Sequence, residues 1–271
     1  MYLSIRDAMV AGDEFPSPIA GLRHLAVEAV EVRLSQEYQV YAMDSKEMIT
    51  LASDEDAAAY RKHLDGLGIR ACCFMTAKDF STGDRESNAA WVARAIELAD
   101  IMGMSVVRID SAMSKERELD FEKRVQLFAE GLGGALERTA GSKVALGIEN
   151  HDRFTAQALA GMVQAAESPL VGICLDTVNS FGALEGPRVV VGTLAPWTVS
   201  LHIKDFAIRR VGHAMGFVVE GTPAGQGRLD VPWLLEALAR ARSIDAGNRH
   251  RQLAVITDAA GVARFVKVAV S

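Results

Sequence analysis

The sequence has few cysteines, no long apolar run and fewer basic than acidic residues, and each of these features disfavours a class of protein. Its 271 residues include three cysteines, Cys72, Cys73 and Cys174, an odd number that builds neither a disulfide framework nor a CxxC metal site. We expect buried thiols in a reducing cytoplasm. No apolar run reaches the roughly 18 residues that a membrane helix needs, and no basic region followed by an apolar stretch marks a signal peptide. We therefore expect a cytoplasmic protein with no membrane partner.

The net charge and the absence of phosphate-binding motifs disfavour two further classes, nucleic-acid-binding and nucleotide-binding proteins. The formal net charge is −6, which disfavours a nucleic-acid partner held by bulk positive charge. The glycine-rich patterns GxGxxG and GxxxxGK[ST], which cradle phosphates, do not occur. Hydrophobic residues make up 49% and charged residues 24% of the chain, which is the ordinary balance of a globular protein.

Short apolar segments alternate with longer helical patterns along the chain. Such alternation is typical of parallel βαβ units. We predict eight strands, at residues 3–6, 29–33, 69–75, 106–110, 144–149, 171–176, 199–204 and 253–256. The clearest helical patterns cover residues 54–67, 86–102, 118–140, 155–166 and 231–241.

The spacing of these units favours a closed barrel over an open doubly wound sheet. Glu149, Asp176 and His202 mark the ends of three successive strands, at intervals of 27 and 26 residues. Eight such units fill about 250 residues, the size of a (β/α)8 TIM barrel. An open sheet usually carries a glycine-rich turn after an early strand, which this chain lacks. We therefore expect an α/β protein with a single TIM barrel domain over residues 1–271.

Potential metal ligands stand at the ends of those same three strands. In a TIM barrel the carboxyl ends of the strands form the mouth that carries the active site, and neighbouring strands lie about 4.8 Å apart. The two carboxylates and the imidazole of Glu149, Asp176 and His202 suit Mn²⁺, Mg²⁺, Zn²⁺ or Fe²⁺. Each has an ordinary alternative, since a carboxylate could cap a helix and His202 could be a hydrogen-bonded core histidine. A shared polar site explains all three together.

With these segments the chain resembles the xylose isomerase-like TIM barrels, which include sugar isomerases and epimerases, inosose dehydratases, hydroxypyruvate isomerases and endonuclease IV. The resemblance extends to about residue 240. Its most specific segments are residues 147–151, 175–180, 201–206 and the glycine-rich stretch 221–230. It implies that Glu149, Asp176 and His202 fall on three of the family's four metal-ligand positions. Relatives are often dimers or tetramers, so a homo-oligomer is one option, although no stripe of residues demands it.

The fourth ligand position departs from the family. The family normally has a glutamate at the end of strand eight, whereas this chain has Thr257 there, followed by Asp258. Asp258 is one residue out of phase, because successive side chains of a strand point to opposite faces. It can serve as the fourth ligand only if the strand has already ended. The chain stops 13 residues later, so we expect a short or atypical eighth βα unit.

The resemblance implies a divalent-metal-dependent isomerase, epimerase or dehydratase that acts on a small sugar, polyol or hydroxy-keto acid through a metal-stabilised enediolate. Glu149 would move the proton. The lack of an opposite glutamate favours a one-base isomerisation or a dehydration over a two-base epimerisation. One alternative is a degenerate barrel that binds a sugar without turning it over. A remote alternative is a phosphodiesterase like endonuclease IV, which the scarcity of histidine at the early strand ends and the negative charge disfavour.

Three residues on the later strands are candidates for contact with the substrate. Lys204 lies two residues beyond His202 and so on the same side; it could be catalytic by steadying an oxyanion, could hold an anionic group, or could pair with Asp205. Asn179 stands where several relatives have a histidine. Glu220 lies in residues 206–230, a connection far longer than the usual two to six residues, which we interpret as a lid.

Further candidates stand on earlier strands. Arg108 and Asp110 end the fourth predicted strand, and they could line the mouth or form a salt-bridge layer inside the barrel. Glu31 and Arg33 have the same two options at the end of the second strand. His151 could support the metal site or lie in a plain loop.

Overall fold

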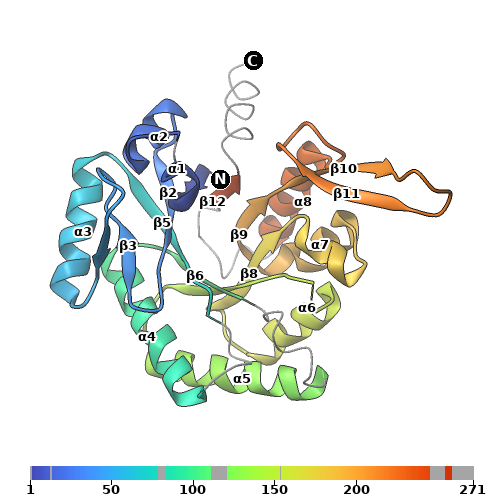
Figure 1. Cartoon of the computed structure of the whole chain (residues 1–271). Helices are drawn as coiled ribbons and strands as arrows, with labels where there is room; N and C mark the ends of the chain where they lie inside the picture. The colour runs from blue at the N-terminus through green and yellow to red at the C-terminus, as the bar shows by residue number, and fades with distance from the viewer. Residues whose placement is uncertain are drawn as a thin grey trace.

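Eight parallel strands close into a barrel in this chain. The computed structural model describes residues 2–12, 14–78, 84–110, 121–152, 154–244 and 254–257. The strands follow one another around the barrel in the order β1-β12-β9-β8-β7-β6-β5-β2, and β2 pairs with β1 to close it. Helices lie around the outside of the strands (Figure 1). The predicted α/β barrel is confirmed.

All eight predicted strands occur, with small differences at their ends. They are β1 (Tyr2–Arg6), β2 (Ala29–Arg33), β5 (Arg70–Met75), β6 (Val106–Asp110), β7 (Ala145–Glu149), β8 (Val171–Asp176), β9 (Thr198–Ile203) and β12 (Ala254–Thr257). The eighth strand of the barrel, β12, has four residues, in line with the short closing unit that we expected. Residues 258–271, and Asp258 with them, lie outside the described residues.

Several helices, α2, α3, α4 and α6 among them, begin at a residue whose side chain caps the first turn. In α3, Ser53 accepts a hydrogen bond from the backbone of Asp56, whose side chain accepts one in return from the backbone of Ser53, which is a capping box. The helices are α1 (Asp7–Val10), α2 (Pro18–His24), α3 (Asp54–Gly66), α4 (Arg85–Ile101), α5 (Phe121–Arg138), α6 (Ala156–Ala165), α7 (Pro187–Leu194) and α8 (Val231–Ile244), with short 3-10 turns η2 (Asn179–Ala183) and η3 (Ala195–Trp197). No helix in the described part of the chain combines the length and apolar character that crossing a bilayer requires.

Two antiparallel hairpins interrupt the βα pattern, and the sequence did not indicate either of them. One joins β3 (Gln39–Tyr41) to β4 (Met48–Thr50), and the other joins β10 (Asp205–Arg210) to β11 (Phe217–Thr222). The second hairpin accounts for most of the long segment after β9, and it extends away from the barrel (Figure 1).

The floor below the mouth of the barrel is apolar. A Cβ atom placed on Gly147 would lie 3.2 Å from side-chain atoms of both Val106 and Val199. These two valines belong to β6 and β9, which are not neighbours, so the contact lies inside the barrel. Glu149 is two residues beyond Gly147 on the same strand and therefore faces the same way. The charged side chains at the mouth thus lie above a close-packed apolar layer.

Gly172 on β8 should not tolerate a side chain. A Cβ there would come within 2.7 Å of the backbone oxygen of Trp197 and 2.5 Å of Val199, so we expect Gly172→Ala to lower the free energy of unfolding by about 1–3 kcal/mol. Gly161→Ala is the control, because no atom lies within 4 Å of a Cβ at that position in α6, and alanine should stabilise the helix by up to about 1 kcal/mol. Urea unfolding followed by circular dichroism measures both. Equal stability of the two variants would contradict the packing described for β8 and β9.

Candidate functional site

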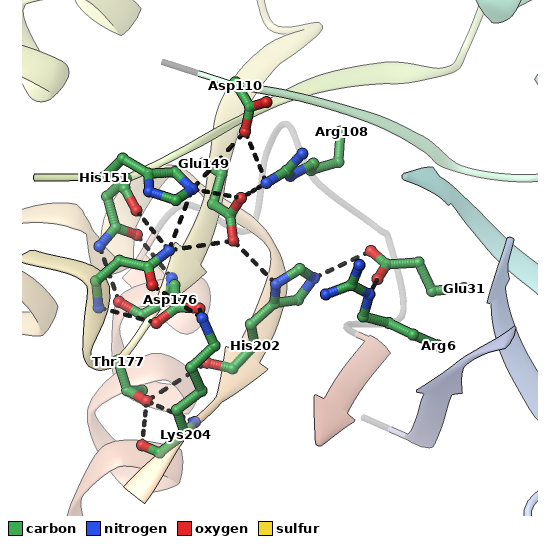
Figure 2. A network of polar contacts seen from close by, with 12 residues as sticks. Arg6, Glu31, Arg108, Asp110, Glu149, His151, Asp176, Thr177, His202 and Lys204 are labelled. Atoms are coloured by element: carbon green, nitrogen blue, oxygen red, sulfur yellow. Dashed lines mark hydrogen bonds and ion pairs between the residues drawn. The ribbon is translucent and has the colours of Figure 1, made fainter. Parts of the chain in front are cut away.

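A network of buried charged side chains occupies the mouth of the barrel (Figure 2). Glu149 and Asp176 are the last residues of β7 and β8, and His202 is the fifth residue of β9. In the strand register Asp176 lies opposite His202, whereas Glu149 lies opposite Cys174. Asp176 and His202 therefore share the depth that we expected, and Glu149 lies two residues lower. This offset follows from the stagger that closes a sheet into a barrel.

Both carboxylate oxygens of Glu149 have partners. Oε1 lies 3.2 Å from Nδ1 of His202 and accepts a hydrogen bond of 3.3 Å from the side-chain amide of Asn179. Oε2 forms an ion pair with Arg108 and lies 3.2 Å from Nε2 of His151. The side chain is only 3% exposed, so its charge is compensated by protein groups rather than by water.

Asp176 is fully buried and is held by its neighbours along the chain. Its Oδ1 accepts hydrogen bonds from the backbone of Val178 and Asn179, while Oδ2 lies 2.8 Å from Nζ of Lys204. The amide of Asn150 bonds both the backbone N–H and the backbone carbonyl of Asp176, at 2.6 and 2.8 Å. Asp176 thus caps the turn after β8, as one interpretation had it, and also presents a carboxylate oxygen to the mouth.

His202 lies between two carboxylates. Its Nε2 is 3.0 Å from Oε1 of Glu31 on β2, and its Nδ1 faces Glu149. Burial alone would lower the pKa of His202, but the Cys174 sulfur and the Glu31 carboxylate raise this pKa to about 10. Burial acts to raise the pKa of Glu31, yet the adjacent imidazole holds it below its ordinary value. Each charge stabilises the other.

Three cations of the described chain belong to the network, and they are Arg6 on β1, Arg108 on β6 and Lys204 directly after β9. Arg108 on β6 contacts both Glu149 and Asp110, the latter at 2.8 Å. The ammonium group of Lys204 forms an ion pair with Asp176 and donates a hydrogen bond of 2.9 Å to Asn179 Oδ1. These are its partners in place of Asp205, which was one of the alternatives. The salt-bridge layer and the lining of the mouth, which were alternatives for Arg108 and Asp110, are therefore one and the same feature.

The other sequence candidates lie in different places. His151 joins the network beside Glu149 and Asp110, and burial lowers its pKa. Glu220 lies on β11 of the projecting hairpin, where its exposed carboxylate pairs with Arg209, outside the network of Figure 2. Thr257 is the last residue of β12, and its backbone is aligned with that of Ile203.

The sequence did not decide the role of two supporting residues, Glu31 and Asn150. Glu31 had two equal options together with Arg33, but Glu31 is buried in the network while Arg33 is exposed. Asn150 stands between two candidates in the segment 147–151 that carries the family resemblance, and this position was the one available signal. The contact of Glu31 with His202 spans 171 residues of sequence, so no local pattern could reveal it.

Asp205 organises the glycine-rich stretch that follows the hairpin. Its carboxylate accepts backbone hydrogen bonds from Phe206, Gly225, Gly227 and Leu229, at 2.7–2.9 Å. A Cβ on Gly227 would lie 2.3 Å from Asp205 Oδ1 and from the backbone oxygen of Phe206. The glycine is therefore required because the loop backbone lies directly against a buried carboxylate.

The donor set at the mouth fits a divalent cation. Glu149, Asp176 and His202 offer ligand atoms that lie within 4.8 Å of one another. Oδ2 of Asp176 is buried and faces the Lys204 ammonium group at 2.8 Å, and a divalent cation could take the place of that positive charge. Asp110, Glu149 and His151 form a second such group, but Arg108 already places a cation between its two carboxylates.

Comparison with known proteins places the chain in a family. Residues 22–244 match the family model for the xylose isomerase-like TIM barrel. The chain belongs to the xylose isomerase-like TIM barrel family. A curated relative, 3-oxo-isoapionate decarboxylase from Pectobacterium atrosepticum, is 33% identical over 129 residues, and the match covers 40% of this chain. The match spans 47% of that decarboxylase, about half of its length.

Solved structures of the same family share the barrel. D-psicose 3-epimerase from Clostridium cellulolyticum H10 in complex with D-tagatose has a TM-score of 0.68 at 14% identity, over 95% of this chain and 85% of that one. A xylose isomerase-like TIM barrel protein from Mycobacterium smegmatis in complex with magnesium has a TM-score of 0.69 at 14% identity, over 93% and 85% of the two chains. At such identities the likeness establishes the fold alone.

Asp205→Asn should loosen the glycine-rich stretch. An amide replaces one acceptor oxygen by a donor that faces backbone N–H groups, and unsatisfied buried donors cost about 1–3 kcal/mol each, so we expect a loss of about 2–4 kcal/mol in unfolding free energy. Asp100→Asn, at an exposed position of α4, should change stability by less than about 0.5 kcal/mol. Denaturant unfolding compares the two variants, and amide hydrogen exchange at Gly225 and Gly227 should accelerate in Asp205→Asn alone. Unchanged exchange would contradict the role assigned to Asp205.

Proposed function

We propose that this chain is a divalent-metal-dependent enzyme that labilises a bond next to the carbonyl group of a small hydroxy-keto compound, with isomerisation of a sugar or hydroxy-keto acid as its first candidate reaction. The observation that carries the proposal is the convergence of the buried side chains of Glu149, Asp176 and His202 from three strands at the barrel mouth. Family membership supports it, and so do the sugar epimerase and the magnesium complex among the similar structures.

Glu149, Asp176 and His202 would hold the cation, which when bound supplies a Lewis acid that polarises a carbonyl oxygen and stabilises the negative charge that develops there. Glu149 can also accept a proton from the carbon next to the carbonyl, because it sits at the bottom of the mouth beside the point where a substrate must lie. Lys204 is 48% exposed, so its ammonium group can reach a substrate oxygen. Asn179 lies beside both and can orient a hydroxyl group.

The residues at the mouth favour chemistry with a single base. Inversion of a carbon centre needs acid–base groups on both sides of the substrate, whereas β12 ends in Thr257 where the family has a glutamate. An isomerisation that moves a proton along one face needs Glu149 alone. Isomerisation is therefore a better candidate than epimerisation, and a non-catalytic sugar-binding barrel is the alternative if no turnover is found.

Asp176→Asn should abolish metal binding without unfolding the mouth. The amide oxygen can still accept the backbone hydrogen bonds of Val178 and Asn179, but the second oxygen becomes a donor that cannot ligate a cation. We expect about one Mn²⁺ per chain in the wild type and a loss of affinity greater than about 100-fold in the variant. Titration followed by the electron paramagnetic resonance of free Mn²⁺ measures this, together with elemental analysis of the purified protein.

The matched control is Asp65→Asn, which changes an exposed carboxylate on α3. Proton removal is then tested by deuterium uptake from D₂O into keto-sugars and hydroxy-keto acids, which Glu149→Gln should slow by about 10²–10⁴-fold. Metal binding without uptake in any substrate would favour the non-catalytic barrel. Wild-type protein that binds no Mn²⁺ at millimolar concentration would refute the metal-dependent function.

Decarboxylation of a 3-oxo acid is the second candidate, and the charge of the mouth favours it. The contacts in Figure 2 join four carboxylates, Glu31, Asp110, Glu149 and Asp176, to three permanent cations, Arg6, Arg108 and Lys204. With a neutral histidine ligand and a divalent cation, this set has a net charge of +1. A site with one excess positive charge favours a monoanionic substrate such as a keto acid.

The bond that breaks would differ while the developing charge stays the same. In a 3-oxo acid the C–C bond to the carboxylate breaks, its electron pair moves to the carbonyl oxygen to form an enolate, CO₂ leaves, and a proton then returns to carbon. The same cationic surroundings stabilise the enolate in both reactions. The 33% identity to a 3-oxo-isoapionate decarboxylase over part of the chain supports this candidate.

Lys204→Met should distinguish acidic from neutral substrates. Removing one charge-assisted hydrogen bond to a carboxylate costs about 1.5–3 kcal/mol, so KM for a 3-oxo acid should rise about 10- to 100-fold, while KM for a neutral keto-sugar changes little. CO₂ release and keto-sugar conversion, both followed by NMR, provide the two assays. Lys62→Met, at an exposed position of α3, should leave both unchanged. Equal effects of Lys204→Met on both substrate classes would contradict the anion-binding role.

A further inference from the structure

The Glu31 carboxylate is placed to control which nitrogen of His202 is available at the mouth. Glu31 lies on β2, and His202 lies on β9. These strands are not neighbours in the barrel, so the 3.0 Å contact between Glu31 Oε1 and His202 Nε2 crosses the interior (Figure 2). On the opposite side of the ring, Nδ1 lies 3.2 Å from Oε1 of Glu149.

Both ring nitrogens face a carboxylate oxygen, but the two carboxylates differ in their place. Glu149 belongs to the proposed ligand set with Asp176, whereas Glu31 lies outside it. A neutral imidazole carries its proton on one nitrogen and a lone pair on the other, so a cation held by Glu149 and Asp176 would take the lone pair of Nδ1, the nitrogen on their side. The proton would then stay on Nε2, where the Glu31 carboxylate can accept its hydrogen bond.

We propose that Glu31 is a positioning residue, which holds the His202 ring with Nε2–H toward β2 and the Nδ1 lone pair toward the metal point. This inference rests on the proposed metal-dependent function and adds to it a residue from a distant strand. Partners of this kind fix the tautomer and orientation of a ligating histidine in metalloproteins.

In the described part of the chain, Glu31 has few polar contacts other than the one with His202. Its side chain is completely buried, and among the described residues His202 is its hydrogen-bond partner while Oε2 has none. Arg6 on β1 lies 3.8 Å from Oε2, which is an ion-pair distance without a hydrogen bond. A buried carboxylate is costly unless it is paired, so its place beside one nitrogen of His202 is the feature that a positioning role explains.

Glu31→Gln and Glu31→Leu test the inference at constant or similar side-chain size. Glutamine can accept the Nε2 hydrogen bond weakly but lacks the charge, and leucine removes the acceptor. We expect Mn²⁺ affinity to fall by about 10-fold in Glu31→Gln and by up to about 100-fold in Glu31→Leu. Glu28→Gln, an exposed carboxylate just before β2, should bind Mn²⁺ as the wild type does.

A second measurement separates positioning from general destabilisation. In Zn²⁺-loaded protein with ¹⁵N-labelled histidine, the wild-type His202 should show a protonated Nε2 and a metal-bound Nδ1, and Glu31→Leu should lose this single pattern even when its unfolding midpoint is restored by saturating Zn²⁺. Wild-type affinity in Glu31→Leu, or an unchanged ¹⁵N pattern, would overturn the inference while leaving the proposed function intact. Failure of the wild type itself to bind Mn²⁺ or Zn²⁺ would overturn both.

Discussion

The mouth of this barrel depends on the burial of the Glu149 carboxylate. A carboxylate that is 3% exposed is stable only if the protein supplies the interactions that water would otherwise make. Its partners Arg108, His202 and Asn179 come from β6, from β9 and from the turn after β8. Closure of the barrel is what brings these strand ends together, so the fold and the charged network form as one unit. Apolar side chains pack closely around Gly147 beneath them.

The ion pairs that compensate the charges of Glu149 and Asp176 would also determine how a bound cation and a substrate change each other's affinity. Arg108 and Lys204 each contact a carboxylate that the proposed cation needs as a ligand. A cation at this point therefore competes with both side chains and leaves them with positive charge to share with another anion. By thermodynamic linkage an anionic substrate would then favour cation binding to the same extent that the cation favours the substrate. The network would thus couple the two ligands through the side chains of Arg108 and Lys204 alone.

The sequence predicted the barrel because each strand is a short apolar run and the units repeat at nearly constant length. It also predicted the convergence of Glu149, Asp176 and His202, because strand ends in a barrel share one face. The hairpin of β10 and β11 escaped prediction, since its strands are mostly exposed and lack the apolar alternation that marks a half-buried strand. The partnership of Glu31 with His202 escaped for a different reason. It depends on the closure of β2 onto β1, which is a property of the complete barrel rather than of any segment.

The strand order shows which charged residues lie on the side of the mouth where β12 ends without a glutamate. This strand lies between β9 and β1, and on that side Glu31 lies beside His202 and forms an ion pair with Arg6 at 3.8 Å. A carboxylate is thus present near this side of the mouth, but it contacts the imidazole ring of His202 and does not belong to the proposed ligand set. Similar structures at 14% identity share the barrel and therefore cannot indicate this arrangement. A common fold fixes where the strand ends meet, while the particular charges at those ends decide the chemistry.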